Sequence, residues 1–405
     1  MCFTASVHPR LVSTMNIFGA LLLASTVGGR SISRSNGLAG IVEGKTKLTF
    51  DGAGNFKVVS FSDMHTGERW GNGSWADWGP ANDAATQNVH ATVLDNEKPN
   101  YVVFNGDMMT GENVFASNAT NYLDIVFAPT VARSIPFSCT HGNHDNADNI
   151  NHQIEIEYEQ ANYASLSYTR SDAGPQPYGG GNYWVPVYAK STDTVPAAIM
   201  WFFDSRSFVS GTGNGPGPIP DAANFYWVDE NTVPQYIAAQ RTLMEQQWSK
   251  VPPALVFVHI PVQKAQILAP LPSEGDHDDE PDPSTQGFLN NDYTGLDLPF
   301  WNEIIALNGG SDGGNVLAIT SGHDHGESWC ARSTDSSGIP ICFNGHSGYG
   351  GYVTTHSAMR NGRVFELNLA DLQGTVPVVR TWNSYENSTT NDEVVLGPDY
   401  MAQFN

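Results

Sequence analysis

The chain carries five short runs of side chains that can bind metal ions. Aspartate, histidine and asparagine supply the oxygen and nitrogen ligands that transition metals accept in proteins. In chain order the runs are Asp63-Met64-His65, Gly106-Asp107, Gly142-Asn143-His144-Asp145, His259 and Gly322-His323-Asp324-His325. Together they contain enough ligands for two metal ions. A pair of metal ions can activate water and screen the charge of an anionic substrate, so these runs predict metal-assisted hydrolysis.

Each run follows a short apolar segment that we interpret as a buried β-strand. The segments span residues 58–61, 101–104, 136–139, 254–258 and 316–319. In α/β proteins the loops at the carboxyl ends of parallel strands converge on one crevice, and binding sites are built there. We therefore expect the runs to meet at a single site.

The spacing within the first and last runs predicts paired ligands. Side chains two residues apart on an extended segment point to the same side. We therefore expect Asp63 and His65 to hold one metal ion together, and His323 and His325 to repeat this geometry. A set that mixes carboxylate oxygen with imidazole nitrogen suits zinc, iron or manganese, whereas calcium prefers oxygen alone.

The remaining runs complete the predicted centre. The carboxylate of Asp107 can bridge a pair of metal ions about 3.5–4 Å apart, while Asn143 offers an amide oxygen and His259 another imidazole. His144 lies next to a predicted ligand, so we expect it to face the substrate. Two carboxylates and a metal-bound hydroxide do not neutralise two divalent ions. The centre should therefore stay positive and attract a phosphate, which the hydroxide would attack in line.

Four further polar residues lie near the predicted ligands or at the end of a predicted strand. Asp145 and Asp324 either orient ligand imidazoles or are solvated loop carboxylates. His346 either lines the pocket or stabilises its own glycine-rich loop, and Asp204 is expected to cap a strand end.

The composition bounds the class of protein. Among 405 residues, 42 acidic side chains outnumber 19 basic ones, which gives a net charge of −23. We expect no nucleic acid as a structural partner, because phosphate backbones are held by clustered lysine and arginine. Since the ligands run from Asp63 to His325 and must meet, we expect one domain over residues 45–385, followed by a C-terminal tail over 386–405.

Residues 1–29 have the features of a secretory signal peptide, since an apolar run over 17–27 follows Arg10 and ends in small residues. The alternative is a disordered leader without a function. The run is too short to span a bilayer, and no later stretch is long enough to do so. Three sequons, at Asn72, Asn118 and Asn387, are candidate N-glycan sites. We expect a secreted or vacuolar protein.

Two of the cysteines are placed for a disulfide. Cys330 and Cys342 flank a turn-rich segment that can fold two strands into a hairpin. A bond that closes a loop of that size stabilises the fold by about 2.5–3 kcal/mol. Cys139 lies in a predicted buried strand and is expected to pack as a small apolar side chain.

Further elements follow from the periodicity of apolar residues. Helices are predicted over residues 82–97, 121–132, 149–162 and 233–250. Strands at 45–50 and 56–62, on either side of a turn, open the domain. A second sheet is predicted from strands at 183–188, 197–203, 341–344, 363–369 and 378–382. The acidic stretch 273–297 is interpreted as an exposed loop, with a lid or specificity role as the alternative.

The five runs match, in order and spacing, the signature of the calcineurin-like metallophosphoesterases: DxH, GDxx, GNHD, a lone histidine after a strand, and GHxH. This resemblance implies an α-β-β-α sandwich of two mixed sheets flanked by helices. It implies that one metal ion is held by Asp63, His65, Asp107 and His325, and the other by Asp107, Asn143, His259 and His323. It also implies that His144 contacts the phosphoryl group or protonates the leaving oxygen. Residues 342–352 resemble secreted and vacuolar fungal phosphatases of the superfamily.

Two departures narrow what the resemblance implies. Purple acid phosphatases carry a tyrosine three residues after the bridging aspartate, and this chain has Thr110 there, so the protein should not be purple. Serine/threonine protein phosphatases have an aspartate and an arginine where this chain has Thr110 and Gly111, so phosphoprotein specificity is not implied. We expect a phosphomonoesterase that acts on a small phosphorylated substrate. The alternatives are a phosphodiesterase or nucleotidase, and a secreted metal-binding glycoprotein without activity.

Overall fold

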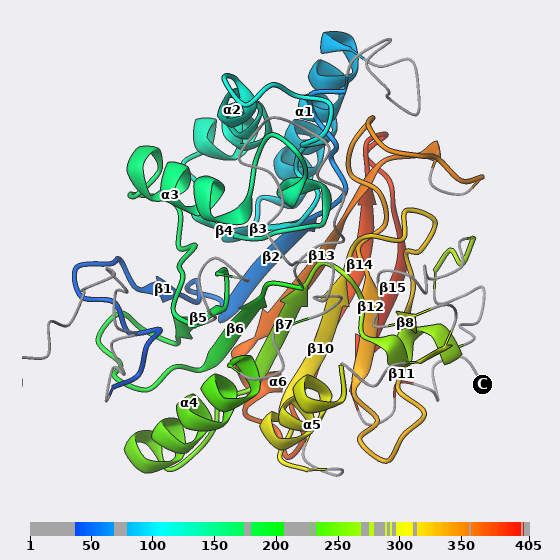
Figure 1. The fold of residues 1–405 in the computed structure, drawn as a ribbon. Coiled ribbons are helices and arrows are strands. Elements are labelled where there is room, and N and C mark those ends of the chain that lie inside the picture. Colours follow the sequence, from blue (N-terminus) through cyan, green and yellow to red (C-terminus); the bar gives the residue numbers. More distant parts are fainter. Residues whose placement is uncertain are drawn as a thin grey trace, which may run out of the picture. The chain divides into compact units, whose positions relative to one another are not determined.

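The main architectural feature is a pair of stacked β-sheets (Figure 1). The structure is a computed structural model, and it describes residues 37–68, 79–173, 180–205, 228, 232–268, 275–278, 288–289, 292–293, 297–310, 314–355, 358–397 and 400. The predicted signal segment, the sequon at Asn72 and most of the acidic stretch 273–297 lie outside the described residues. The chain from Gly37 to Asn405 forms one unit. Within the described ranges, no helix has the length and apolarity needed to cross a bilayer.

The first sheet has seven strands in the order β1-β5-β6-β7-β10-β12-β11. Their bounds are Leu48–Thr49 (β1), Tyr183–Tyr188 (β5), Ala198–Phe203 (β6), Ala254–Val258 (β7), Val316–Ser321 (β10), Pro340–Phe343 (β12) and Cys330–Arg332 (β11). Strands β6, β7, β10 and β12 run parallel, whereas β11 returns antiparallel to β12. The carboxyl ends of the parallel strands therefore lie at the same edge of this sheet.

The second sheet has six strands in the order β15-β14-β13-β2-β3-β4. Their bounds are Thr390–Leu396 (β15), Val379–Tyr385 (β14), Asn361–Asn368 (β13), Asn55–Phe61 (β2), Tyr101–Asn105 (β3) and Phe137–Thr140 (β4). Strands β2, β3 and β4 are parallel, and β13 pairs antiparallel with β2. A separate two-stranded sheet joins β8 (Phe288–Leu289) to β9 (Asp292–Tyr293).

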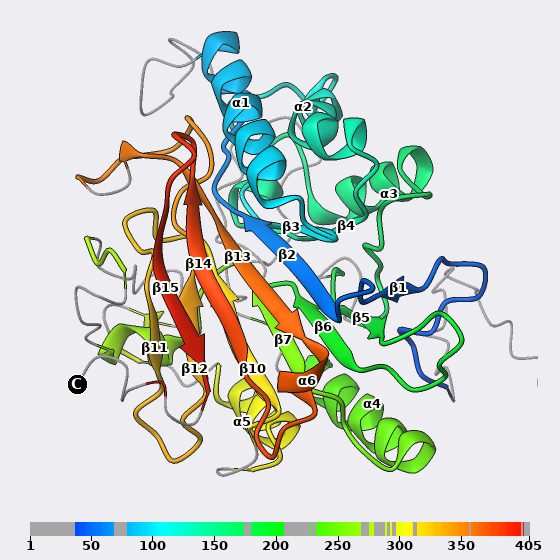
Figure 2. The same ribbon diagram turned by 180° about the vertical axis from the view of Figure 1, so that it is seen from behind.

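Helices cover the outer faces of the two sheets (Figures 1 and 2). Helices α1 (Pro80–Glu97), α2 (Ala119–Ala132) and α3 (His152–Asn162) lie beside β2, β3 and β4, while α4 (Val233–Trp248) and α5 (Leu298–Leu307) lie beside the seven-stranded sheet. Short helical turns are η1 (His144–Asn146), η3 (Gln263–Ile267) and α6 (Leu369–Leu372). The layers confirm the predicted α-β-β-α sandwich.

The strands are apolar on both faces because each sheet is covered twice. On β3, Val103 packs in the core between the sheets, and its neighbours Val102 and Phe104 pack in the core beneath α1 and α2. On β7, Phe257 faces the other sheet, while Val256 packs in the core that contains residues of α4 and α5. Successive side chains of a strand alternate between its faces, so a continuous apolar run fits a strand buried on both sides.

The predicted division of strands between the sheets is wrong in two places. The strands predicted at 363–369 and 378–382 join the first predicted sheet instead, since β13 pairs with β2. The strands on either side of the turn at 51–55 separate, because β1 pairs with β5 of the other sheet. Helix α5 was not predicted, and β15 forms within the segment 386–405 that we expected to be a tail. Pairing partners are set by tertiary packing, which local periodicity does not report.

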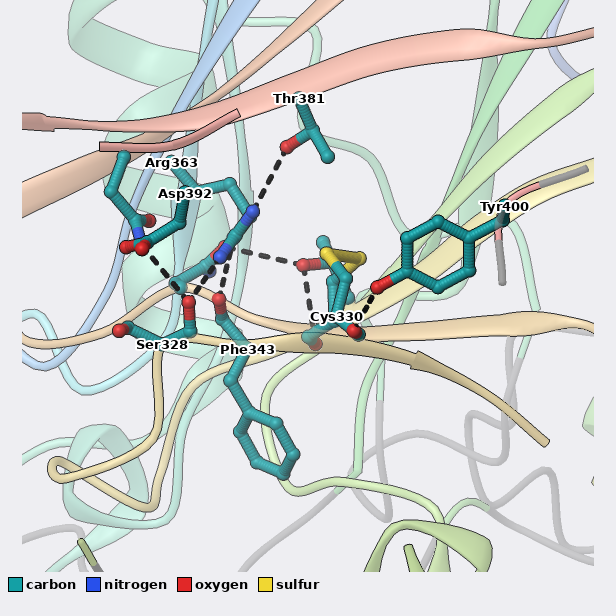
Figure 3. The surroundings of a disulfide bond; sticks show 11 residues. Ser328, Cys330, Phe343, Arg363, Thr381, Asp392 and Tyr400 are labelled. Atoms are coloured by element: carbon teal, nitrogen blue, oxygen red, sulfur yellow. Dashed lines mark hydrogen bonds between the residues drawn. A yellow bond between two sulfur atoms is a disulfide. The ribbon is translucent and has the colours of Figure 1, made fainter. Parts of the chain in front are cut away.

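A buried arginine joins the two sheets beside the disulfide (Figure 3). Arg363 of β13 donates from Nε to the carbonyl oxygen of Phe343 at 2.6 Å and from a guanidinium nitrogen to the carbonyl oxygen of Ser328. Burial lowers the pKa of Arg363 to about 10, so the side chain stays charged at neutral pH. Cys330 and Cys342 face each other across β11 and β12 and form the predicted disulfide. Cys139 is buried and free, as expected.

Replacing both Cys330 and Cys342 by alanine should lower the free energy of unfolding by about 3 kcal/mol, because the unfolded chain regains the entropy of a closed loop. The measurement is urea unfolding followed by circular dichroism. The unaltered protein in a strong thiol reductant is the control and should lose a similar amount. Unchanged stability of the double variant would show that the bond does not constrain the unfolded chain.

Candidate metal centre

The five runs meet where strands of both sheets end. Asp63 follows β2, Asp107 follows β3, and the segment 142–145 follows β4, while His259 follows β7 and the segment 322–325 follows β10. Among the residues that the structure describes, three groups of side chains have potential ligand atoms that lie within 4.8 Å of one another. These groups are Asp63, His65 and His325; Asp107, His259 and His323; and His65, Asp107 and His144. Asp107 is therefore shared between two groups, and so is His65.

The backbone of these runs is not extended, which corrects the predicted geometry. Asp63, His65, Asp107 and His323 have φ angles of 57°, 47°, 49° and 73°. Such left-handed conformations are costly for residues with a side chain, and they cluster at functional sites where the surrounding structure holds them. His323 and His325 fall into different groups, so they do not repeat the pairing of Asp63 with His65.

Two glycines of the runs are required by close packing against predicted ligands. A Cβ atom on Gly106 would lie 2.3 Å from Nδ1 of His259. A Cβ atom on Gly142 would lie 2.1 Å from Oδ1 of Asp107. Both distances are far below van der Waals contact, so only glycine lets the backbone approach the centre this closely.

Hydrogen bonds fix how two of the imidazoles face the centre. Nδ1 of His259 lies 2.8 Å from the carbonyl oxygen of Asn105, and Nδ1 of His325 lies 2.7 Å from the carbonyl oxygen of Tyr352. Because a carbonyl oxygen only accepts, each Nδ1 donates, and Nε2 is directed into the centre. Nε2 of His259 is 3.2 Å from Oδ2 of Asp107, and Nε2 of His325 is 3.5 Å from Oδ1 of Asp63.

The charged side chains of the centre shift one another's pKa values. Burial raises the pKa of Asp107, but His259 and His144 lower it by more, so the pKa lies well below its ordinary value. Burial raises the pKa of Asp63, but the imidazole of His325 lowers it by more, so this pKa also lies below its ordinary value. Burial lowers the pKa of His259, while Asp107 raises it to a net value of about 10. Both carboxylates are therefore ionised and ready to bind cations.

The side chains fit a pair of metal ions. The Nε2 atoms of His65 and His325 lie 3.2 Å apart, and two imidazole nitrogens at this distance are stabilised by a cation between them. Oδ1 of Asn143 is buried and has no hydrogen-bond partner among the described residues. A buried amide oxygen without a partner is costly unless an ion or water binds it. The mixture of carboxylate, amide and imidazole ligands suits zinc, iron or manganese.

His144 is paired with a glutamate that the sequence motifs did not indicate. Its Nδ1 lies 2.7 Å from Oε1 of Glu112, and its ring meets the ring of His65 at a centroid distance of 4.9 Å. Burial lowers the pKa of His144, but Asp107 and Glu112 raise it to about 9. The backbone N–H of His144 also donates to Oδ1 of Asp107 at 2.8 Å. The carboxylates of Asp107 and Glu112 thus favour the protonated form of His144.

The neighbouring polar residues have structural partners. Asp145 is buried and accepts from the backbone of Gly142 and Met109, so it shapes its loop instead of being solvated. Nε2 of His346 donates to the carbonyl oxygen of Gly350 in its own loop at 2.7 Å, and the centroid of its ring lies 4.1 Å from that of the His325 ring. His346 therefore stabilises its loop, as one of the two interpretations predicted, and it also packs against a predicted ligand.

Asp324 and Asp204 are the two remaining polar residues for which the sequence predicted a role. Asp324 is buried, which excludes a solvated carboxylate. Asp204, at the end of β6, accepts from the backbone of Gly180 at 3.0 Å and lies 2.9 Å from Nδ1 of His152. His152 in turn lies 2.7 Å from the carbonyl oxygen of Gly142. Asp204 therefore supports the loop that carries Asn143 and His144.

Comparison with known proteins identifies the family. The sequence model of the family described as "Calcineurin-like phosphoesterase" matches residues 56–347. The chain belongs to the calcineurin-like phosphoesterase family. This assignment confirms the family resemblance that the five runs predicted.

Individual relatives are distant. The chain is 26% identical over 355 residues to phosphatase DCR2 of Saccharomyces cerevisiae. The alignment covers 85% of this chain and 56% of that protein. It therefore spans little more than half the length of that relative. It is also 26% identical over 368 residues to a protein of Arabidopsis thaliana named "Probable inactive purple acid phosphatase 14", covering 85% of this chain and 84% of the relative. Among solved structures, a dimetal phosphatase from Danio rerio aligns with 15% identity and a TM-score of 0.46, covering 84% of this chain and 98% of the other.

Metal binding at neutral pH should release protons from the centre. His259 holds a proton below its raised pKa of about 10, and a metal ion needs the lone pair of Nε2, so an ion that binds there displaces the proton. We expect zinc to release about one proton from this residue near neutral pH. Titration calorimetry in buffers of different ionisation enthalpy measures the number. His259→Gln should release fewer protons, and equal release by both proteins would exclude His259 as a ligand.

Proposed function

We propose that the protein is a dimetal-dependent hydrolase of phosphate esters, and specifically a phosphomonoesterase. The observation that carries the proposal is the position of Asp107, whose carboxylate belongs to two overlapping groups of potential ligands from five separate loops. A shared carboxylate of this kind holds two ions close enough to act on one phosphoryl group. Membership of the calcineurin-like phosphoesterase family agrees with this chemistry.

We assign the ligands as the family resemblance implies, and the groups that the loops form support this assignment. One ion would be held by Asp63, His65, Asp107 and His325, and the other by Asp107, Asn143, His259 and His323. When bound, two such ions withdraw electron density from the phosphoryl oxygens and acidify the attacking water. The ionised carboxylates of Asp63 and Asp107 offset only part of the cationic charge, so the centre favours an anionic substrate.

His144 is proposed as the catalytic acid and phosphoryl contact. Glu112 accepts the proton of Nδ1, which leaves the N–H of Nε2 to donate to a phosphoryl oxygen or to the leaving oxygen. The raised pKa of about 9 keeps this imidazole protonated at neutral pH. The backbone N–H of His144 donates to Oδ1 of Asp107, and this hydrogen bond fixes the position of the acid relative to the shared carboxylate.

A monoester suits the centre better than a diester because it carries more negative charge toward a cationic site. A phosphodiesterase or nucleotidase would use the same ligands, and the two classes differ in the substrates they accept. The third alternative is a protein without activity, and the names of three Arabidopsis thaliana relatives describe those relatives as probably inactive. The pairing of His144 with Glu112 favours activity, because a site that only binds metal has no use for a charged acid beside the ligands.

We further propose that the protein enters the secretory pathway and reaches the exterior or the vacuole. The disulfide between Cys330 and Cys342 supports this route, since such bonds persist in oxidising compartments. The sequon residue Asn387 is exposed between β14 and β15, whereas Asn118 is half-buried at the start of α2. Asn387 is therefore the more accessible of the two for an N-glycan.

His144→Ala should lower kcat on a simple aryl phosphate monoester by about 10²- to 10⁴-fold, because the proton donor is lost. Metal content, measured by elemental analysis, should stay at two ions per chain. His277→Ala, which removes a histidine paired with Glu327, is the control and should keep full activity. Unchanged turnover of His144→Ala, or fewer than two ions in the unaltered protein, contradicts the mechanism. Faster hydrolysis of the matching bis-aryl diester makes the protein a diesterase.

Glu112→Gln should shift the alkaline limb of the pH–rate profile to lower pH. The carboxylate of Glu112 raises the pKa of His144, so its removal lets the acid lose its proton at a lower pH. We expect kcat at neutral pH to fall by about tenfold. Glu157→Gln, which changes an exposed carboxylate of α3, is the control. If the alkaline limb does not move in Glu112→Gln, Glu112 does not control the protonation of His144.

A further inference from the structure

We propose that Glu68 and Thr110 form a relay that sets which nitrogen of His65 carries the proton, and so makes His65 able to bind metal. The inference rests on the proposed function, because it concerns one ligand of the proposed centre. Neither residue belongs to the metal-binding runs. Glu68 lies three residues beyond His65, and Thr110 lies three residues beyond Asp107.

The three side chains form a continuous, buried chain of hydrogen bonds. Nδ1 of His65 lies 3.0 Å from Oγ1 of Thr110. The hydroxyl of Thr110 donates to Oε1 of Glu68 at 2.5 Å, and the amide of Asn113 donates to Oε2 of Glu68 at 2.7 Å. His65, Thr110, Glu68 and Asn113 are all buried. In such surroundings the direction of each hydrogen bond is strongly constrained, since water does not compete.

His65 needs this relay because its partner is a hydroxyl. His259 and His325 donate from Nδ1 to backbone carbonyl oxygens, which can only accept. A threonine hydroxyl can donate as well as accept, so it does not by itself determine which nitrogen of an imidazole carries the proton. If Thr110 donated to Nδ1, the proton of a neutral His65 would sit on Nε2 and block metal binding there.

Glu68 removes this ambiguity. A carboxylate that accepts at both oxygens, from Thr110 and from Asn113, takes the hydroxyl proton of Thr110 as its hydrogen bond. The lone pair of Oγ1 is then left to accept from Nδ1 of His65. Nε2 of His65 consequently carries a lone pair, and it lies 3.2 Å from Nε2 of His325 and 3.6 Å from Oδ2 of Asp107. Glu68 and Thr110 are thus positioning residues that act through His65.

Backbone hydrogen bonds beside the relay join the two loops that carry His65 and Thr110. The backbone N–H of Thr110 donates to the carbonyl of Thr66 at 3.1 Å, and the N–H of Thr66 donates to the carbonyl of Met108 at 3.1 Å. The loop after β2 and the loop after β3 are therefore held in register on the side of His65. Asp107 and His259 of the other group contact the backbone of His144 and Asn105 instead.

The test is the affinity of the two sites for zinc, measured by equilibrium dialysis against buffered free zinc with elemental analysis of the protein. Thr110→Val keeps the shape of the side chain and removes the acceptor, and Glu68→Gln removes the fixed acceptor of the hydroxyl proton. We expect each variant to bind one of the two ions about 10- to 100-fold more weakly and the other ion as before. Thr110→Ser restores the hydroxyl and should bind both ions like the unaltered protein.

Thr130→Val is the matched control, because it makes the same change at a buried threonine of α2 whose hydroxyl has no partner among the described residues. The relay is overturned if Thr110→Val and Glu68→Gln bind both ions with unaltered affinity. It is also overturned if they lose both ions together with a lower unfolding temperature, which indicates a structural role alone. If the unaltered protein fails to bind two zinc ions, the proposed function is wrong. This result differs from the one that overturns the relay, in which the unaltered protein and the variants bind both ions equally.

Discussion

The geometry of the centre depends on one shared, buried carboxylate. Oδ1 of Asp107 accepts the backbone N–H of His144 at 2.8 Å, while Oδ2 lies 3.2 Å from Nε2 of His259 and 3.6 Å from Nε2 of His65. A buried carboxylate is costly unless positive charge or hydrogen-bond donors surround it. The loops that surround Asp107 supply both. This requirement explains why the backbone around it adopts left-handed conformations and why Gly142 has no room for a side chain.

The centre exists only when the two sheets are held in register. Asp107 follows β3 of the six-stranded sheet and His259 follows β7 of the seven-stranded sheet. Asn105, the last residue of β3, connects them, because its carbonyl holds Nδ1 of His259 and its side chain donates to the carbonyl of Thr320 in β10 at 3.2 Å. Arg363 joins the same two sheets near these strand ends, because it pairs with Ser60 of β2 and donates to the carbonyl of Phe343, the last residue of β12. The sandwich core therefore stabilises the fold and also aligns the ligands.

The sequence predicted the parts of this structure that local pattern controls. Apolar runs such as 254–258 became buried strands with nearly the predicted bounds, and the predicted ligands meet at the strand ends because parallel strands share an edge. Sheet membership was mispredicted for β13, since the pairing of strands far apart in the chain leaves no trace in periodicity. Glu68 and Glu112 were missed because single glutamates beside motifs resemble solvated loop residues. Their contacts with Thr110 and His144 depend on backbone turns that the extended interpretation did not include.

The most direct test of the central claim is a crystal structure of the zinc-loaded protein with anomalous diffraction recorded at the zinc absorption edge. We expect two anomalous peaks about 3.5–4 Å apart on either side of the Asp107 carboxylate. One peak should lie next to His65 and His325, and the other next to His259 and His323. A single peak, or two peaks that do not share Asp107, would contradict the account.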